Sequence, residues 1–498
     1  MSLEEKTGVE AGHGGPRQLV EKVLRHADAN LSASLDRFFQ FLRIPSISCD
    51  ASYAPQCREA ASWIADELSG IGFQASVRPT IGNPMVVAHN KEANGPHVLF
   101  YGHYDVQPAE PLDAWNSNPF EPSLKEQLDG ETHIVARGAS DDKGQLLTFI
   151  EACRSWKAVT GQLPISVSMF FEGEEETDSK SMEAFLDEAG EELTADVMLL
   201  CDTYLWKDTV PAIVVTFRGV LEDSIEISCA SRDLHPGHYS NAARNPIQVL
   251  ADLIAGLRGA DGEVAIEGFY DDIKKIDDKL RANMAELDFD ADAYLSNVGL
   301  SRSAGETAYS VLEQIWTRPA FEIYGISGGH YNGHGFKCAI PSTAFAKIAF
   351  RLVPGQDPQR IRAAFRNHIR ARTPVDCKLK FSDVEVEGPP VVLSHKSPYV
   401  ESALAALKQE WNLEPVLIGS GGQIPVIHTI KHRLGLDSLP IGFARSNNGH
   451  HSANEKYDLS SFHKGIRSWI RILAELAQCA NDWPRIAVGD NPGADRAT

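Results

Sequence analysis

The most informative segment of this chain is Val98-Leu-Phe-Tyr-Gly-His-Tyr-Asp-Val-Gln-Pro108. Its apolar first half is typical of a strand that is buried in a sheet. The strand is expected to stop before Pro108, because proline has no N–H to donate to a neighbouring strand. His103 and Asp105 are two residues apart, so their side chains point to the same side. The pair predicts either a metal-binding histidine oriented by a carboxylate or a buried histidine with a hydrogen-bond partner.

Four further segments carry carboxylates or histidines next to a predicted strand or helix. They are Ala136-Arg-Gly-Ala-Ser-Asp-Asp-Lys-Gly144, Phe170-Phe-Glu-Gly-Glu-Glu-Glu176, Leu199-Leu-Cys-Asp202 and Asn447-Asn-Gly-His-His-Ser-Ala-Asn-Glu-Lys456. Helix capping would explain Asp141 or Asp142, and solvated surface acids would explain the glutamate run. Taken together, however, the segments predict a zinc or manganese site, because successive strand ends carry His, Asp, Glu, Asp and His. Asp141, with two carboxylate oxygens, is suited to bridge two cations.

Length and composition indicate a soluble globular protein of more than one domain, because 498 residues exceed one ordinary core. No apolar run approaches the ~18 residues of a membrane-spanning helix, and the polar N-terminus predicts no signal peptide. The eight cysteines are scattered without paired spacing, which favours reduced thiols and a cytoplasmic location. A formal net charge of −21 argues against a nucleic-acid partner.

The hydrophobic pattern predicts a smaller domain inserted into a larger one. In residues 1–215 strands alternate with helices, which predicts an α/β domain with a mostly parallel sheet and helices on both faces. Residues 216–387 suit an α+β domain, with helices on one antiparallel sheet. The first pattern returns in residues 388–498. One helix is predicted over residues 19–42.

In their order along the chain, these motifs resemble those of the M20 family of dinuclear metallopeptidases. Within that family they are most similar to the cytosolic nonspecific dipeptidase, or carnosinase-like, branch. The resemblance covers nearly the whole chain and includes Asp233-Leu-His235 and Phe350-Arg-Leu-Val-Pro354. It implies that the larger domain is catalytic and that the ferredoxin-like insertion is a lid and dimerisation domain.

The resemblance also implies two divalent metal ions and a role for each nearby residue. The implied ligands are His103 and Asp202 for one ion, Glu176 and His451 for the other, and Asp141 between them. Glu175 is the implied general base. Asp105 is implied to support His103, and the peptide bond between Asp141 and Asp142 is implied to be cis.

Substrate-binding residues follow from the same resemblance. His235 matches a histidine that enters the partner subunit's site and stabilises the oxyanion, which implies a homodimer. From its surroundings in the sequence alone, it is a loop histidine in a turn. Arg351 matches the residue that holds the substrate's terminal carboxylate, a task that suits a bidentate guanidinium. Gly422 and Gln423, in the loop Gly419-Ser-Gly-Gly-Gln423, match a backbone cradle for the substrate.

Individual positions distinguish the branches of the family. Asp142 stands where deacylases tend to carry Met, and Asp202 stands where deacylases and glutamate carboxypeptidases tend to carry Glu. Both positions favour a dipeptidase. Gln423 replaces what looks like a serine of the dipeptidases, and Cys338 replaces a threonine that would contact substrate. The preferred substrate side chains therefore stay open.

We predict a metallohydrolase that cleaves dipeptides or short peptides with a free C-terminal carboxylate, through a water activated by two metal ions and Glu175. An N-acyl amino acid deacylase or amidohydrolase with the same dinuclear site is the alternative. A dimeric binding protein without activity is disfavoured, because Glu175 and every proposed ligand are present. His428 and His432 have the spacing of a zinc pair but lack the adjacent glutamate of a zincin helix, so we expect a surface or packing role.

Overall fold

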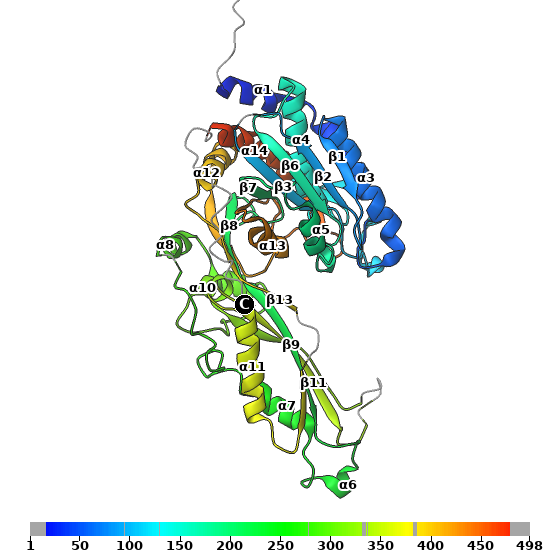
Figure 1. Cartoon of the computed structure of the whole chain (residues 1–498), viewed down its shortest axis with the longest axis vertical. Helices are drawn as coiled ribbons and strands as arrows, with labels where there is room; N and C mark the ends of the chain where they lie inside the picture. Colours follow the sequence, from blue (N-terminus) through cyan, green and yellow to red (C-terminus); the bar gives the residue numbers. More distant parts are fainter. Residues whose placement is uncertain are drawn as a thin grey trace, which may run out of the picture. The chain divides into compact units, whose positions relative to one another are not determined.

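The computed structural model describes residues 16–478, except positions 94, 129, 277, 331–334, 336 and 382–385. They form two compact units (Figure 1). The first unit comprises the described residues up to Pro211, the segment Lys396–Pro415 and the described residues from Leu439 onward. The second comprises Ala212–His395 and Val416–Ser438.

Residues 416–438 are assigned differently from the sequence prediction, which placed them in the larger domain. They belong to the second unit because strand β15 (Val416–Ser420) pairs with β8 (Ala212–Phe217) in parallel. The unit boundaries near residues 211 and 395 also lie a few residues outside the predicted insertion of 216–387. Pairing between strands about 200 residues apart has no local signal in the sequence.

A six-stranded sheet forms the centre of the first unit, in the order β1-β2-β6-β3-β7-β16. Its strands are β1 (Gln74–Arg78), β2 (Met85–Asn90), β3 (His97–His103), β6 (Ser166–Glu172), β7 (Val197–Leu200) and β16 (Ser438–Pro440). Strand β3 runs parallel to both β6 and β7, whereas β2 is antiparallel to β6. Every residue of β6 is buried, as is β3 after its first residue, which explains their apolar sequences. The predicted α/β class is confirmed.

Helices of the first unit pack on this sheet and on one another. They are α1 (Pro16–Ala29), α2 (Leu31–Leu42), α3 (Ala54–Gly70), α4 (Lys143–Thr160), α5 (Met182–Ala189), α12 (Pro398–Trp411) and α14 (Leu459–Gln478). Phe149 of α4 stacks on Phe100 of β3 at 3.9 Å between ring centroids, and buried Trp469 of α14 meets both rings edge-on. This aromatic cluster joins the first part of the chain to its last helix.

The single helix predicted over residues 19–42 is wrong, because the chain breaks between α1 and α2 at Asn30. The backbone of Asn30 leaves the helical region, with φ −108° and ψ 11°, and its side chain donates a hydrogen bond to the carbonyl of His26 at 2.8 Å. Asparagine readily makes such local bonds and is disfavoured inside helices.

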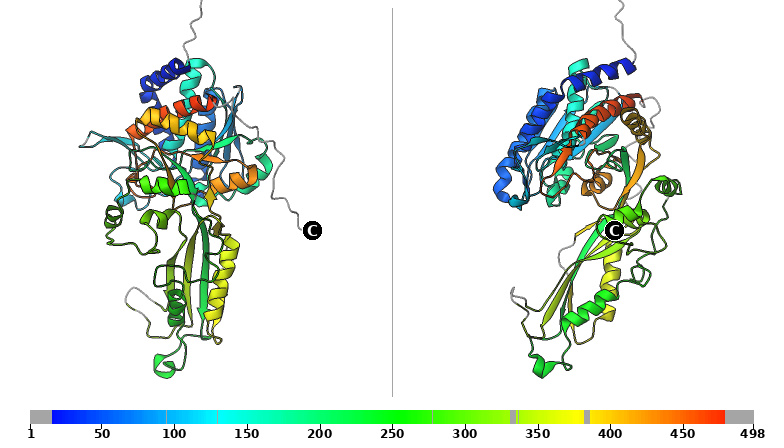
Figure 2. Two further views of the ribbon diagram at one scale, coloured as in Figure 1. Left: turned by 90° about the vertical axis from the view of Figure 1, so that its left-hand side faces the viewer. Right: turned by 180° about the vertical axis from the view of Figure 1, so that it is seen from behind.

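The second unit contains an antiparallel sheet in the order β10-β11-β9-β12. Its strands are β9 (Gly219–Ser228), β10 (Ala320–Gly328), β11 (Thr343–Leu352) and β12 (Lys378–Phe381), and the short β13 (Val386–Gly388) also pairs with β9. Helices α7 (Pro246–Ala255) and α11 (Pro358–Arg372) lie along the sheet (Figure 2). Their buried apolar residues form one core with alternate residues of β9 and β11. The predicted α+β architecture is confirmed.

Two further features concern the helices and the cysteines of both units. No described helix combines the length and apolar character that crossing a bilayer requires. The seven described cysteines are free thiols, and Cys479 lies outside the described residues. The sulfur atoms of Cys229 and Cys377 approach each other to 3.0 Å.

Candidate metal centre

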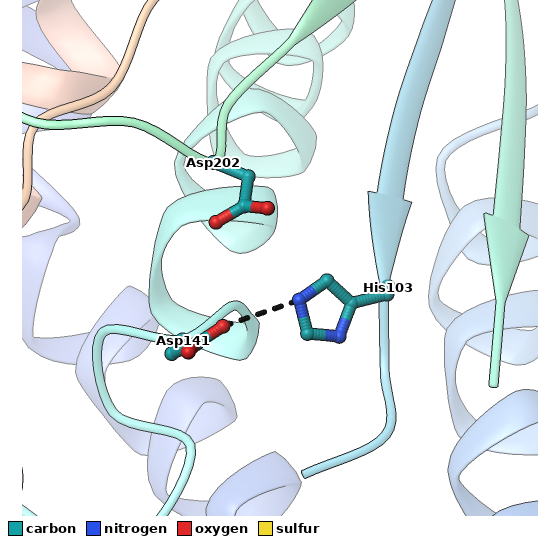
Figure 3. A group of neighbouring side chains, drawn as sticks. All are labelled: His103, Asp141 and Asp202. Carbon is teal, nitrogen blue, oxygen red and sulfur yellow. Dashed lines mark ion pairs between the residues drawn. The ribbon is translucent and has the colours of Figure 1, made fainter. Parts of the chain in front are cut away.

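The five predicted ligands all lie in the first unit, at the end of a strand of the sheet or in the turns and loops next to it. His103 is the last residue of β3, Asp202 follows β7 by two residues, and Glu176 lies in the 3-10 turn Glu175–Thr177 that follows β6. Asp141 immediately precedes the N-cap of α4. His451 lies in the loop before β17 (Lys456–Asp458), with a left-handed backbone at φ 58°. Figure 3 shows His103, Asp141 and Asp202 converging from three separate segments.

These side chains form two groups that share one member. In the first group, His103, Asp141 and Asp202 each offer a ligand atom, and these atoms lie within 4.8 Å of one another. Asp141, Glu176 and His451 form the second group by the same measure. Asp141 Oδ1 lies 3.2 Å from His103 Nε2, and its Oδ2 lies 3.0 Å from His451 Nε2. Asp141 thus turns one oxygen to each group.

Asp105 connects one of these ligands to the turn after β6. His103 Nδ1 lies 3.1 Å from the main-chain carbonyl oxygen of Asp105 and 3.3 Å from its Oδ1. The same carboxylate accepts hydrogen bonds from the main-chain N–H groups of Glu175 and Glu176, at 3.3 and 3.1 Å. Asp105 is fully buried. It therefore directs Nε2 of His103 toward Asp141 and fixes the turn that carries the two glutamates.

The loop that carries Asp141 is held by a residue that the sequence prediction missed. Buried Glu455 accepts hydrogen bonds from the main-chain N–H groups of Gly138, Ser140 and Asp141, at 2.9, 2.9 and 3.1 Å. It also pairs with buried Arg137 at 2.8 Å. The only indication of this role in the sequence is that Glu455 lies in the histidine-containing segment Asn447–Lys456.

Two other backbone features distinguish this loop. The peptide bond between Asp141 and Asp142 is cis, as expected. Gly144, in the first turn of α4, has no room for a side chain, because a Cβ atom there would lie 2.0 Å from the carbonyl oxygen of Ala139. The glycine therefore allows the loop to fold back on the start of α4.

The carboxylates of the centre and their burial shift the pKa values of its ionisable side chains. Burial raises the pKa of Asp202 to about 6, and Asp141 acts in the same direction. Hydrogen bonds to Asp141 and Glu176 raise the pKa of His451 to about 10. Burial alone would lower the pKa of His103, but its carboxylate neighbours reverse this and raise it well above the usual range. The cluster is therefore stabilised by positive charge, as protons on the imidazoles or as cations.

The donor atoms suit divalent metal ions. One of them, Glu176 Oε1, is buried and makes no hydrogen bond to any described residue. Buried polar atoms without partners are rare in native proteins and call for a ligand or a catalytic role. Imidazole nitrogen and carboxylate oxygen are ligands of zinc and of manganese. The described residues therefore fit the dinuclear group that the sequence predicted.

Two residues near the ligands were also missed by the sequence prediction. Gln107 Nε2 donates to Glu176 Oε2 at 2.8 Å, and Tyr204 Oη lies 2.9 Å from His450 Nδ1 with the two rings stacked. His450 Nδ1 lies 3.7 Å from Asp141 Oδ2, farther than the Nε2 of His451. Of the two histidines, His451 therefore lies nearer to the carboxylate of Asp141.

Glu455→Gln is expected to lower the free energy of unfolding by about 3–5 kcal/mol, because it leaves the buried Arg137 cation without its partner. We also expect a 10–100-fold loss of metal affinity, the usual cost when a residue that orients a ligand is changed. Urea unfolding and metal titration measure the two effects.

Glu410→Gln is the matched control for this prediction. Glu410 lies on α12, and its largely buried carboxylate pairs with Arg467 and Arg471 at 2.6 and 2.9 Å. This variant should lose stability and keep its metal affinity. Equal metal affinities in the two variants would show that Glu455 serves stability alone.

The predicted substrate-binding residues all belong to the second unit. Exposed His235 is the N-cap of α6 (Pro236–Tyr239), and its Nδ1 accepts a hydrogen bond from Gly237 N at 3.1 Å. Half-buried Arg351 lies on β11, and its Nη2 is 3.5 Å from Tyr324 Oη.

The predicted substrate loop follows β15. The main-chain N–H of Gly422 donates to Ser420 Oγ at 3.1 Å. The side chain of Gln423 packs against Gly388. A Cβ atom added to Gly388 would lie 1.9 Å from Nε2 of Gln423.

The histidine pair on α13 (Pro425–Leu434) belongs to neither ligand group. The rings of His428 and His432 stack on each other, with 5.8 Å between their centroids.

Comparison with known proteins agrees with this geometry. A family model described as Peptidase family M20/M25/M40 matches residues 99–475. The Cys-Gly metallodipeptidase of Schizosaccharomyces pombe is 27% identical over 475 residues, which are 92% of this chain and 98% of that protein. The Beta-Ala-His dipeptidase of Rattus norvegicus is 27% identical over 404 residues, 79% of this chain and 80% of that protein.

Comparison of the fold with solved structures also finds a dipeptidase. The solved structure of a dipeptidase from Saccharomyces cerevisiae matches with a TM-score of 0.77 and 25% sequence identity, covering 92% of this chain and 98% of that chain. The family match contains all five residues of the two ligand groups. The chain therefore belongs to Peptidase family M20/M25/M40, as its motifs predicted.

Proposed function

We propose that this protein hydrolyses the peptide bond of dipeptides or short peptides with a free C-terminal carboxylate, using two divalent metal ions. The predicted enzyme class, an M20-type metallodipeptidase, is confirmed by the family match and by the metallodipeptidase relatives. The number of metal ions and the role of each residue are the proposal. The observation that carries it is the position of Asp141 in both ligand groups, with one oxygen toward each.

The proposed mechanism assigns a task to each side chain of the centre. His103 and Asp202 would hold one cation, Glu176 and His451 would hold the other, and Asp141 would contribute to both sites. When bound, the cations would lower the pKa of a bound water and polarise the scissile carbonyl group.

Glu175 is the proposed general base. Its carboxylate accepts the proton of the attacking water and passes it to the amine that leaves as the C–N bond breaks. Burial, opposed by His103 and reinforced by Asp202, raises the pKa of Glu175 well above its usual range. A raised pKa suits a group that must accept and then return a proton. Asp105 keeps the base in place through the main-chain N–H of Glu175.

The second unit supports a site shared between two subunits. Arg351 pairs with Val220 near the start of β9, and Thr343 pairs with Ser228 at its end, beyond which His235 follows. The two pairings are therefore separated by roughly 26 Å along the strands, whereas an extended dipeptide spans at most about 7 Å. His235 and Arg351 of one chain therefore do not reach the same dipeptide. This supports a homodimer in which His235 stabilises the oxyanion in the partner's site while Arg351 holds the substrate carboxylate.

Mixing inactive variants tests the shared site. His235→Ala and Glu175→Gln proteins should each be inactive, and their hybrid dimers should contain one intact site of two. After random subunit exchange we expect about one quarter of wild-type activity. The mixture of Glu175→Gln with Asp141→Asn is the control. Each substitution inactivates the metal centre of its own subunit, so no hybrid dimer contains an intact site. No recovery in the first mixture, despite exchange shown by native mass spectrometry, contradicts the shared site.

Metal removal tests the proposed function directly. We expect a chelator to abolish dipeptide hydrolysis and zinc or manganese to restore it. Zinc is the proposed native ion because imidazole and carboxylate ligands suit it. The same assay should include N-acetyl amino acids, and hydrolysis of these without hydrolysis of dipeptides would select the deacylase or amidohydrolase. The scattered cysteines support a cytoplasmic location as part of the proposal.

A further inference from the structure

The second unit contains a cavity of about 480 Å³ that is lined only by residues of that unit. Residues of α9 (Ala291–Ser296), of α10 (Val311–Trp316) and of the segments on either side of α10 surround it. Part of its wall is apolar, formed by Leu295, Leu300, Val311 and Ile315. Its size lies within the range of about 300–1,000 Å³ that is usual for small-molecule sites.

Arg218 places a guanidinium group at this cavity, and the described residues give it no salt-bridge partner, although Glu322 is near enough to act on its pKa. It is half-buried, its Nε donates to the carbonyl of Gly421 at 3.1 Å, and its Nη1 donates to the carbonyls of Gln314 and Arg318. Among the described residues, no carboxylate pairs with its guanidinium and no acceptor bonds to its Nη2. Burial lowers the pKa of Arg218 to about 10, and the like charge of Arg351 acts in the same direction. A partly desolvated cation of this kind is stabilised by an anionic ligand.

The other charged residues of the lining leave one positive charge in excess. Arg258 is exposed, donates to the carbonyls of Ala304 and Phe321, and pairs with no carboxylate of the described chain. A third arginine, Arg318, is neutralised by Glu306 through two bonds of 2.6 and 2.7 Å. Glu322 is the second carboxylate of the lining. The lining thus contains three arginines and two glutamates, so it is locally positive although the net charge of the protein is −21.

We infer that this cavity binds a small amphipathic monocarboxylate. Its carboxylate would bond to Nη2 of Arg218, with Arg258 as the second cation, and its aliphatic part would lie against the apolar wall. Guanidinium groups bind carboxylates strongly and with defined geometry. A single negative charge matches the excess charge of the lining, whereas a phosphate dianion would exceed it and would be repelled by Glu322. The cavity includes no residue of the proposed metal centre, so binding there does not depend on the proposed reaction.

Isothermal titration of the metal-loaded protein with 4-methylpentanoate tests this inference. We expect one site per chain, and we expect the neutral amide of the same acid to bind at least about tenfold more weakly. A parallel titration with N-acetyl-L-leucine distinguishes the two sources of such an anion. Tighter binding than 4-methylpentanoate identifies an acylated amino acid as the ligand class, and weaker binding identifies an aliphatic acid. Equal binding of the acid and its amide overturns the inference.

Substitutions then locate the binding site. Arg258→Gln should weaken binding of 4-methylpentanoate at least about tenfold, and Leu300→Trp, which fills the cavity from an exposed position, should do the same. Arg370→Gln is the matched control, because Arg370 is also exposed in this unit and lies 5.0 Å from a phenylalanine ring, as Arg258 does. Binding that survives both cavity variants, or that disappears in Arg351→Gln, overturns the inference.

Discussion

Glu175→Gln is expected to lower kcat for dipeptide hydrolysis by about 10²–10⁴-fold, the range that a general base contributes. The amide has nearly the shape of the carboxylate but accepts no proton from water. The five ligand residues are unchanged, and Asp105 holds this turn through main-chain N–H groups that the substitution keeps. The variant should therefore bind its full complement of metal. Steady-state kinetics and elemental analysis on one preparation measure both quantities.

Glu174→Gln is the matched control for Glu175→Gln. Glu174 is the preceding residue, its carboxylate accepts a hydrogen bond from the main-chain N–H of Ser181, and it belongs to neither ligand group. The control removes the same charge from the same segment, so kcat should stay near the wild-type value. A metal-loaded Glu175→Gln enzyme with near-wild-type kcat would show that another group takes the proton.

The five proposed ligands could be singled out from the sequence because each has a local signal. A buried strand must be apolar, so a histidine or carboxylate at its end, as at His103, Glu176 and Asp202, stands out against the preceding residues. Parallel strands then bring their carboxyl ends to one edge of the sheet, where sites form in α/β proteins. Asp141 and His451 were found through their motifs, and the structure joins them to the other three.

The supporting residues could not be predicted, because their roles depend on contacts that sequence order does not specify. Glu455 acts on main-chain N–H groups more than 300 residues earlier in the chain. Arg218 was missed because nothing in its neighbours reveals that it lacks a carboxylate partner. The break at Asn30 was missed because apolar spacing on both sides is helical, and a single polar residue redirects the backbone. The pairing of β15 with β8 was missed for the same long-range reason.

Asp141→Asn is expected to remove both metal ions, whereas changing a ligand of one group should remove only one. Asp141 contributes an oxygen to each group, so its loss weakens both sites together. Asp202→Asn should keep the ion held by Glu176 and His451, and Glu176→Gln should keep the ion held by His103 and Asp202. We expect at least about a 10³-fold loss of kcat/KM in Asp141→Asn, roughly 4 kcal/mol of transition-state stabilisation.

Metal stoichiometry after equilibrium dialysis separates these three variants, and circular dichroism shows whether each is folded. The predicted pattern is two ions per chain in the wild type, none in Asp141→Asn and one in each of the other two. If Asp141→Asn retained one tightly bound ion, Asp141 would belong to a single site and would not be the bridge. If it retained both, the two groups would bind their cations independently, because the carboxylate that they share in the structure would contribute to neither site.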